Sequence, residues 1–101
     1  MPGKQRPYRV LYHPLVVDRD IPVLPAKMKA RIKLAIEQRL TTQPQHYGKP
    51  LRYSLKGHRR LRVGDWRVVY RIVARDRMVI ILVICHRKEV YSTVVSRLPR
   101  D

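Results

Sequence analysis

Apolar residues recur every three or four positions between residues 28 and 40, which is the spacing of one face of an α-helix. The members of this face are Met28, Ile32, Ala35, Ile36 and Leu40. The basic residues of the segment lie mostly on the other faces; they are Lys27, Lys29, Arg31, Lys33 and Arg39. Pro25 stands just before the segment, where a proline suits the first turn of a helix. The pattern predicts an amphipathic helix whose apolar face packs on a core.

Shorter and less regular stretches flank this helix. Arg9–Tyr12 is typical of a short extended segment, which Pro14 interrupts. Residues 15–24 contain apolar side chains without a clear period, and Pro22 rules out a long regular helix, so we assign no element to them. Residues 41–50 contain two prolines and a glycine, which predicts a loop.

The second half of the chain has the composition of β-strands. Residues 59–63, 66–74 and 78–85 are predicted as strands, because the region is rich in β-branched and aromatic residues, above all in the last two segments. Gly64-Asp65 and Arg75-Asp76 separate these segments at the spacing of hairpin turns. The last of the three segments is continuously apolar, as expected of a central strand that is covered on both faces.

Alternation within residues 66–73 separates the two faces of the predicted sheet. Arg67 and Arg71 share one face with Val69. The other face is apolar and should pack on the helix; it holds Trp66, Val68, Tyr70 and Ile72. Residues 90–98 are compatible with a short closing helix or with a mobile tail. The sequence thus predicts an α+β domain, an antiparallel meander in the order β-α-β-β-β with N-terminal helical cover on one face and the opposite face open.

The charge balance indicates the kind of partner. The chain has 101 residues, the size of one domain, so we treat residues 1–101 as a single unit. Lysine and arginine number 23 against 7 aspartates and glutamates, which gives a formal net charge of +16. Self-repulsion on this scale destabilises the compact state, and solubility alone needs much less charge. A nucleic acid or an acidic protein is therefore the expected partner.

Cysteine usage and the apolar runs bear on the location of the protein. Cys85 is the single cysteine, so no disulfide framework exists and a reducing compartment is expected. Because Cys85 lies in an apolar run, we interpret it as a core residue rather than a nucleophile. The N-terminal residues lack the apolar segment of a signal peptide, and the longest apolar run is too short to span a bilayer. The sequence predicts a cytoplasmic protein with no membrane partner.

A basic stretch lies between Glu37 and Asp65, with no acidic residue inside it. Because side chains alternate along a strand, Arg60 and Arg62 point the same way, and Arg67 belongs to the neighbouring strand. Arginines on adjacent strands form a surface that can grip several phosphates. A solvated basic face without any chemistry is the alternative. The candidate RNA-binding residues are Lys56, His58, Arg59, Arg62 and Arg71.

A second constellation follows the predicted central strand directly, from His86 to Tyr91. Cleavage of RNA by its own 2′-hydroxyl needs a group that takes the hydroxyl proton, cations for the developing phosphorane charge, and a donor for the leaving oxygen. Arginine suits the second task but not the first, because it does not readily lose its proton. Proton transfer then rests on His86, His58 or Tyr91, although a histidine after a strand is often structural. The candidate catalytic residues are Arg60, Arg67, His86, Arg87 and Tyr91.

Other reaction templates are absent from the sequence. It contains no glycine-rich phosphate loop, no cysteine pair and no His-Glu-x-x-His zinc motif. Carboxylates do not pair within any basic cluster, which argues against two-metal nuclease chemistry. We therefore expect neither a metal nor another cofactor.

Two blocks of the sequence resemble the signature of RelE-like toxins of the RelE/ParE superfamily. The first block runs Lys49-Pro50-Leu51, then Leu55-Lys56-Gly57, then Leu61 to Arg71, and the second runs Ile84 to Tyr91. The blocks cover roughly the second half of the chain. Their order and spacing are more specific for the superfamily than for one activity within it.

The resemblance implies a RelE-like fold and the toxin of a type II toxin–antitoxin pair. RelE-like members are metal-independent endoribonucleases, or mRNA interferases, that enter the ribosomal A site and cut translated mRNA. A cognate acidic antitoxin silences them, and the complex represses its own operon, so operator DNA is contacted only through that complex. By motif, Arg60 and Arg62 fall on the family's basic strand and Arg67 on the arginine before Val-Val-Tyr. Arg87 and Tyr91 fall on the C-terminal pair.

Two features bear on the activity within the superfamily. Some members use lysines where this chain has His58 and two arginines, so the group that takes the proton stays open. ParE-like relatives share the fold, lack the ribonuclease residues and poison DNA gyrase without nuclease activity. The joint presence of Arg67, Arg87 and Tyr91 favours the RelE activity. A non-toxic basic domain that binds nucleic acid is the third alternative.

Overall fold

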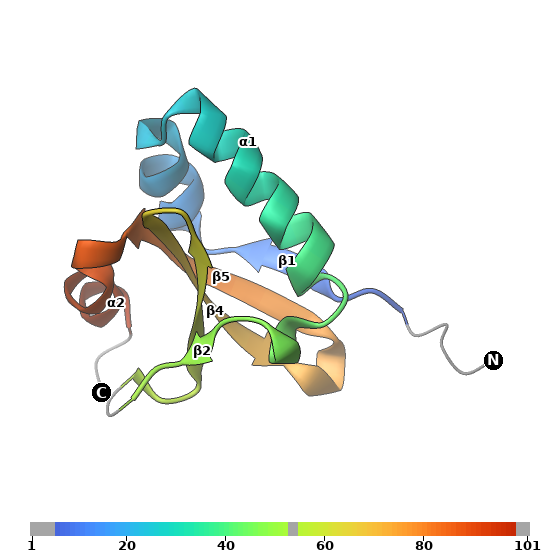
Figure 1. Cartoon of the computed structure of the whole chain (residues 1–101). Coiled ribbons are helices and arrows are strands. Elements are labelled where there is room, and N and C mark those ends of the chain that lie inside the picture. The colour runs from blue at the N-terminus through green and yellow to red at the C-terminus, as the bar shows by residue number, and fades with distance from the viewer. Residues whose placement is uncertain (1–5, 53–54, 99–101) are drawn as a thin grey trace.

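The computed structural model describes residues 6–52 and 55–98, which form a five-stranded sheet with an α-helix on each face (Figure 1). The strands are β1 (Arg9–Tyr12), β2 (Lys49–Pro50), β3 (His58–Val63), β4 (Trp66–Val73) and β5 (Met78–His86). The α-helices are α1 (Ala26–Ala35) and α2 (Val90–Arg97), and shorter helical turns occupy Val16–Asp20, Ile21–Val23, Ile36–Leu40, Pro44–His46, Ala74–Asp76 and Arg87–Glu89. None of the described helices is long and apolar enough to cross a membrane.

The apolar face of α1 packs on the sheet, as the periodicity predicts. Its buried residues, together with those of the turn that continues it, are Ile32, Ala35, Ile36 and Leu40. They share one core with Val68 and Tyr70 of the predicted apolar face, whose Trp66 and Ile72 are partly buried at the margin. Leu61 and Val63 of β3 join the same core. The predicted helix and its docking face are therefore confirmed.

The order of strands in the sheet is β1-β5-β4-β3-β2. The strands β3, β4 and β5 form the predicted antiparallel meander, and β5 is an apolar interior strand between β1 and β4 that is covered on both faces. The first strand, β1, joins β5 in parallel, which the sequence does not reveal. A parallel neighbour requires a long crossover, and the helical segment around α1 supplies it. The short strand β2 pairs with β3 inside the predicted loop.

The face opposite α1 is covered only in part, by α2 and by the segment that precedes β3. Their apolar side chains form a second core with the sheet, made of Leu51, Leu55, Val69, Leu82, Val83, Cys85, Val90 and Val94. A bulge in the β4–β5 pairing turns both Leu82 and Val83 toward α2. The expectation of a fully open second face is therefore wrong, and residues 90–98 contain a closing helix rather than a tail.

Side-chain hydrogen bonds fix the loop that leads into β2. The hydroxyl oxygen of the buried Tyr70 lies 2.8 Å from the carbonyl oxygen of Pro44 and 2.6 Å from that of Tyr47. The Arg59 guanidinium donates from Nε to the Tyr47 carbonyl and from Nη2 to the Gly48 carbonyl, at 3.1 Å in each case. Both side chains come from the α1 face of the sheet, so this face determines where β2 begins.

A buried ion pair joins Asp20, which ends the turn after β1, to Arg97, the last residue of α2. The Arg97 nitrogens Nη2 and Nη1 lie 2.7 and 2.5 Å from the two carboxylate oxygens, and the two side chains are 7% and 8% exposed. Asp20 also accepts from the Ile84 N–H at 2.9 Å, and Arg97 donates to the Leu82 carbonyl at 3.0 Å. Because β1 pairs with β5 only as far as Ile81, the ion pair satisfies backbone groups of β5 beyond the end of β1.

We predict that Arg97→Met destabilises the fold by about 3–5 kcal/mol, because it keeps most of the side-chain volume but leaves a buried carboxylate without its cation. The free energy of unfolding from urea titration measures this. Arg75→Met is the matched control, because the Arg75 side chain is 90% exposed. Equal stability of the two variants would contradict a structural role for the buried pair.

Candidate nucleic-acid interface

Three arginines from two neighbouring strands lie on the part of the second face that α2 leaves uncovered. On β3, Arg60 and Arg62 alternate with Leu61 and Val63, which are buried in the α1 core, so the two arginines point away from that core. Across the β3–β4 pairing, Arg62 is directly opposite Arg67. The structure brings these three side chains together, as the alternation in the sequence predicts.

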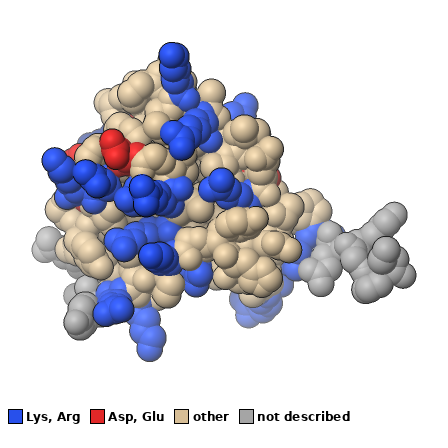
Figure 2. Space-filling model, in the orientation of Figure 1, with Lys and Arg blue, Asp and Glu red and all other residues tan. Residues whose placement is uncertain are grey.

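Two adjoining pockets open at this cluster, and both are lined by Lys49 and Arg60. The first encloses about 330 Å³ and is also lined by Gly48, Leu61, Arg62 and Arg67. The second encloses about 650 Å³ and is also lined by Pro50, Leu51, Arg52 and Tyr91. Figure 2 shows blue side chains gathered over β2 and the neighbouring part of the sheet, with little red among them. The surface is thus a cationic hollow of a size that suits nucleotide phosphates.

Gly48 allows the chain to approach β3 closely at the edge of this hollow. Its φ is +72°, and a Cβ at this position would lie 2.7 Å from the carbonyl oxygen of Arg60 and 2.8 Å from the hydroxyl oxygen of Tyr70. Glycine is therefore required for both its backbone conformation and its contacts. This close approach places Lys49 beside Arg60, its register partner on β3.

Arg67 lies at the centre of the positive charge. Partial burial lowers the pKa of its guanidinium, and repulsion from Arg62, Arg60 and Arg87 lowers it further, while Asp65 acts in the opposite direction. The guanidinium still stays protonated at physiological pH. An anion placed among these cations would relieve their mutual repulsion, and the site is therefore electrostatically prepared for phosphate.

Turn carbonyls and one carboxylate hold the cations at the end of the β3–β4 hairpin. Arg67 Nη1 donates to the carbonyl oxygens of Gly64 at 3.0 Å and Trp66 at 2.9 Å. Arg87 Nε lies 3.9 Å from the Asp65 carboxylate, and both side chains are more than half exposed. The Arg87 guanidinium is thus loosely held and adds its charge at the margin of the cluster.

Tyr91 lies near the start of α2 and reaches the same hollow from the helix side. Its side chain is half exposed, and it lines the second pocket with Arg52 and Arg60. The neighbours Val90 and Val94 are buried in the second core, which fixes the rotation of α2 and so the direction of Tyr91. The sheet and α2 therefore bring Arg60 and Tyr91 together, although they are distant in the sequence.

His58 begins β3 on the same face as Arg60, with Arg71 as its register partner on β4. Burial lowers the pKa of His58, and repulsion from Arg71 lowers it further, while the nearby backbone of Leu55 and Lys56 acts in the opposite direction. The buried Nδ1 has no hydrogen-bond partner among the described residues. The imidazole is therefore neutral at physiological pH. Lys56 and Arg71 are exposed and extend the basic surface at this end.

Two of the predicted site residues lie apart from the cluster. His86 is the register partner of Trp66, and their rings meet edge to face with centroids 5.8 Å apart. Because Trp66 belongs to the α1 face, His86 is turned away from Arg67. Arg59 also points to the α1 face, where loop carbonyls occupy its guanidinium. The sequence places both residues in basic blocks, but strand alternation separates them from the hollow.

The structure adds Lys49 and Arg52, which line the hollow but are not among the residues predicted from the sequence. Both lie in the acid-free basic stretch, and Lys49 begins the first block of the family resemblance, so the signal was present. Their inclusion depends on β2 pairing with β3 inside a segment that the prolines and glycine mark as a loop.

Among the described residues, the hollow contains neither a cysteine thiol nor a group of metal ligands. Burial, with smaller effects from Asp20 and Glu89, raises the pKa of the Cys85 thiol to about 11, so it stays protonated and behaves as the predicted core residue. Within residues 6–52 and 55–98, no three histidine, cysteine, aspartate or glutamate side chains are grouped as metal ligands.

Comparison with known proteins finds similarity to toxins of type II toxin–antitoxin systems. The family model described as the ParE toxin of the type II toxin–antitoxin system parDE matches residues 16–91. Toxin RelG of Mycobacterium tuberculosis is 34% identical over 85 residues, which cover 84% of this chain and 97% of the relative. Toxin RelE of the same organism is 38% identical over 73 residues, covering 72% and 75%.

Solved structures agree with this assignment. The crystal structure of the toxin–antitoxin complex RelBE2 from Mycobacterium tuberculosis contains a chain that matches with a TM-score of 0.74 at 34% identity, covering 83% of this chain and 95% of that one. A mutant Escherichia coli toxin RelE in the free state has a TM-score of 0.73 at 16% identity, covering 92% and 99%, and supports the fold alone. The chain is a toxin of the RelE/ParE superfamily, whose members belong to type II toxin–antitoxin systems.

Proposed function

We propose that this toxin is an endoribonuclease that cleaves translated mRNA in the ribosomal A site. The observation that carries the proposal is the convergence of Arg60, Arg62 and Arg67 with Tyr91 around two adjoining pockets. Tyr91 brings a phenolic hydroxyl to the second pocket, which Arg60 also lines. Phosphodiester cleavage needs both fixed cations and a group that handles protons.

The proposed reaction uses the RNA's own 2′-hydroxyl as the nucleophile. This oxygen loses its proton and attacks the adjacent phosphorus, and a 2′,3′-cyclic phosphate forms as the bond to the 5′-oxygen of the next nucleotide breaks. That 5′-oxygen takes up a proton and leaves as a hydroxyl. Arg60, Arg62 and Arg67 stabilise the additional negative charge of the pentacoordinate phosphate, because guanidinium groups donate paired hydrogen bonds to phosphate oxygens.

Two groups able to move protons lie near Arg60. His58 occupies the same strand face two residues away, and its lowered pKa leaves it unprotonated and ready to accept the 2′-hydroxyl proton. Tyr91 lines the pocket beside Arg60 and carries a hydroxyl that can donate to the substrate. We therefore assign the base to His58 and the donor to Tyr91, in place of His86 on the other face.

The proposed partners follow from the charge and from the relatives. Two of the similar structures are complexes of toxin and antitoxin, RelBE2 of Mycobacterium tuberculosis and RelE–RelB of Pyrococcus horikoshii. We propose that an acidic cognate antitoxin binds this chain, since a net charge of +16 needs neutralisation between periods of activity. Operator DNA would be bound only by that complex, and the toxin would act on ribosomes in the cytoplasm.

Inhibition of DNA gyrase is the second candidate function, because the matching family model carries the description of the ParE toxin. In that case the basic hollow would contact protein or DNA without catalysis. The arginine and tyrosine arrangement favours the nuclease. Induction of the toxin in cells separates the two, since mRNA cleavage with translation arrest indicates the nuclease, and DNA damage indicates gyrase poisoning.

We predict that Arg60→Ala and Arg67→Ala each slow single-turnover mRNA cleavage on programmed ribosomes by about 10²–10³-fold, because each removes a cation from the developing phosphorane. Lys33→Ala is the control, since Lys33 is an exposed cation on α1, on the other face of the sheet. Thermal melts of the same variants exclude unfolding as the cause. If the Arg67→Ala variant cleaved mRNA at the wild-type rate, the proposed catalytic role of Arg67 would be wrong.

A pH profile tests the proton-transfer roles. A histidine base works only when unprotonated, and the pKa of His58 lies below its ordinary 6.5. The cleavage rate should therefore rise with pH through a value below 6.5 and then level off. His58→Gln should abolish this rise, because the variant lacks the proposed base whose deprotonation limits the rate in that range.

Tyr91→Phe provides the matched comparison, because it keeps the ring and removes only the hydroxyl. It should lower the rate at every pH while the rise below 6.5 persists, since His58 is intact. A Tyr91→Phe variant of full activity would show that the ring only anchors α2. An unchanged profile in His58→Gln would assign the base to another group.

A further inference from the structure

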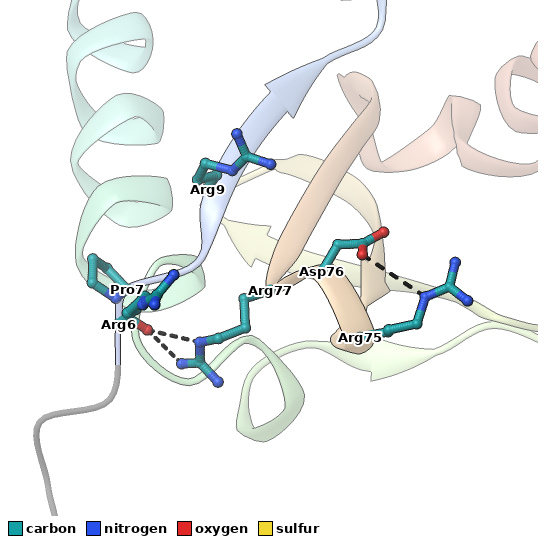
Figure 3. Close-up of a pocket in the computed structure, with 6 residues that line it drawn as sticks. All are labelled: Arg6, Pro7, Arg9, Arg75, Asp76 and Arg77. Atoms are coloured by element: carbon teal, nitrogen blue, oxygen red, sulfur yellow. Dashed lines mark hydrogen bonds and ion pairs between the residues drawn. The ribbon is translucent and has the colours of Figure 1, made fainter.

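A second group of arginines lies at the opposite end of the sheet, where β1 begins and the β4–β5 turn folds back. Four arginines, Arg6, Arg9, Arg75 and Arg77, line a pocket of about 590 Å³ together with Pro7 and Asp76 (Figure 3). We call these four residues the second arginine cluster. None of them belongs to the hollow at Arg60 and Arg67.

Arg77 organises this cluster. Its φ of 48° is the one positive value among the described non-glycine residues, in a conformation that is unfavourable for a residue with a Cβ. Its guanidinium donates from Nε and Nη2 to the Arg6 carbonyl and lies over the Tyr8 ring, 4.2 Å from the ring centroid. The Arg77 carbonyl accepts from the Arg9 N–H at 2.9 Å. The strained residue thus holds the segment before β1 against the turn.

Two of the clustered arginines present their guanidinium groups to solvent. Arg9 is exposed, and its side chain makes no hydrogen bond or ion pair with any other described residue. The Arg75 side chain is 90% exposed, with its Nε 3.8 Å from the Asp76 carboxylate. Figure 3 shows Arg9 on β1 and Arg75 at the β4–β5 turn, with the Arg75 side chain directed away from Arg77. Their hydrogen-bond donors are therefore available to a ligand.

The chemistry of the lining identifies the class of ligand. Arginine forks match phosphate oxygens, and an exposed cationic site gains affinity from a polyanion mainly by charge. Protein partners instead need apolar or aromatic anchors at the centre of the contact. The pocket lining offers only Pro7 for that purpose. We propose that the second arginine cluster binds the phosphate backbone of RNA, separately from the candidate catalytic hollow.

The geometry of the sheet separates the two surfaces. Arg60 is opposite Val69, which pairs with Val83, so the hollow lies six residues along β5 from Arg77, or about 20 Å. β1 and β3 are three strand spacings apart, a further ~14 Å across the sheet. The resulting distance of roughly 25 Å exceeds the Debye length of about 8 Å at physiological salt. The clusters therefore act as independent contacts, which strengthen binding when one RNA reaches both.

The inference goes beyond the proposed function, because binding at this site requires no cleavage. Its test measures the binding of the full chain to a labelled single-stranded RNA of about ten nucleotides by fluorescence anisotropy, at a series of salt concentrations. The Arg9→Gln, Arg75→Gln double variant should bind at least about fivefold more weakly at physiological salt. The negative slope of log K against log salt should become shallower by about 1.4, for two lost contacts.

The matched control is Lys27→Gln with Lys33→Gln, which removes the same charge from exposed positions of α1. It should change the affinity less than twofold, because these lysines lie outside both clusters. When Arg9→Gln and Arg75→Gln are combined with Arg60→Gln and Arg67→Gln, the fold-losses in RNA affinity of the two pairs should multiply, as expected of independent contacts. Equal losses in the Lys27, Lys33 control and in the Arg9, Arg75 variant would overturn the proposal, because only net charge would then matter.

A polyglutamate probe distinguishes RNA from an acidic protein. Unchanged RNA affinity of the Arg9→Gln, Arg75→Gln variant, with selective loss of polyglutamate binding, would assign the cluster to a protein partner and overturn the proposal. Cleavage on ribosomes is measured separately. A wild-type protein that binds RNA through the second arginine cluster but cuts no mRNA would refute the proposed function and leave this inference standing.

Discussion

The buried ion pair between Asp20 and Arg97 is the interaction on which the arrangement of the chain's two ends depends. β1 pairs with β5 over four residues only, and beyond that point the carboxylate accepts from the Ile84 N–H and the guanidinium donates to the Leu82 carbonyl. Arg97 thereby holds the C-terminal end of α2 against β5. Because Tyr91 lies on the first turn of the same helix, the geometry of the hollow depends on a carboxylate that precedes α1.

The hollow also depends on apolar packing beneath it, since its cations repel one another. Arg67 is surrounded by the charges of Arg60, Arg62 and Arg87, and its pKa falls accordingly. β3 and β4 carry the cations of the hollow other than Arg87. Buried side chains hold these strands on both faces, Leu61 and Val68 toward α1 and Val69 toward α2. The rigid sheet therefore stores an unfavourable charge arrangement that a phosphate relieves, a form of electrostatic preorganisation.

The sequence predicts the parts of this structure that local periodicity determines. The period of α1, the hairpin at Gly64-Asp65 and the alternation of Arg67 with Val68 all appear as expected. Contacts between distant segments are not encoded in a local pattern. The parallel pairing of β1, the docking of α2 and the partner of Asp20 each join residues far apart in the chain, and no periodicity reports them.

The same reasoning applies to the site. Alternation on β3 predicts that Arg60 and Arg62 lie together. The basic composition of the stretch also groups Arg59 with them, but Arg59 points to the α1 face and donates to the carbonyls of Tyr47 and Gly48. His86 follows an apolar strand in a basic block, yet its side-chain direction depends on the register with Trp66, which the sequence does not specify. Lys49 enters the hollow only because β2 pairs with β3.

The central claim is that the arginine hollow cleaves RNA through the substrate's own 2′-hydroxyl. Mass spectrometry of the ends produced from a ribosome-bound mRNA tests it most directly, with a second mRNA that carries a single 2′-deoxynucleotide at the cut position. The account predicts a 2′,3′-cyclic phosphate and a 5′-hydroxyl on the first mRNA, and no cut at the substituted position of the second. Cleavage of the 2′-deoxy substrate, or a 3′-hydroxyl end, would contradict it.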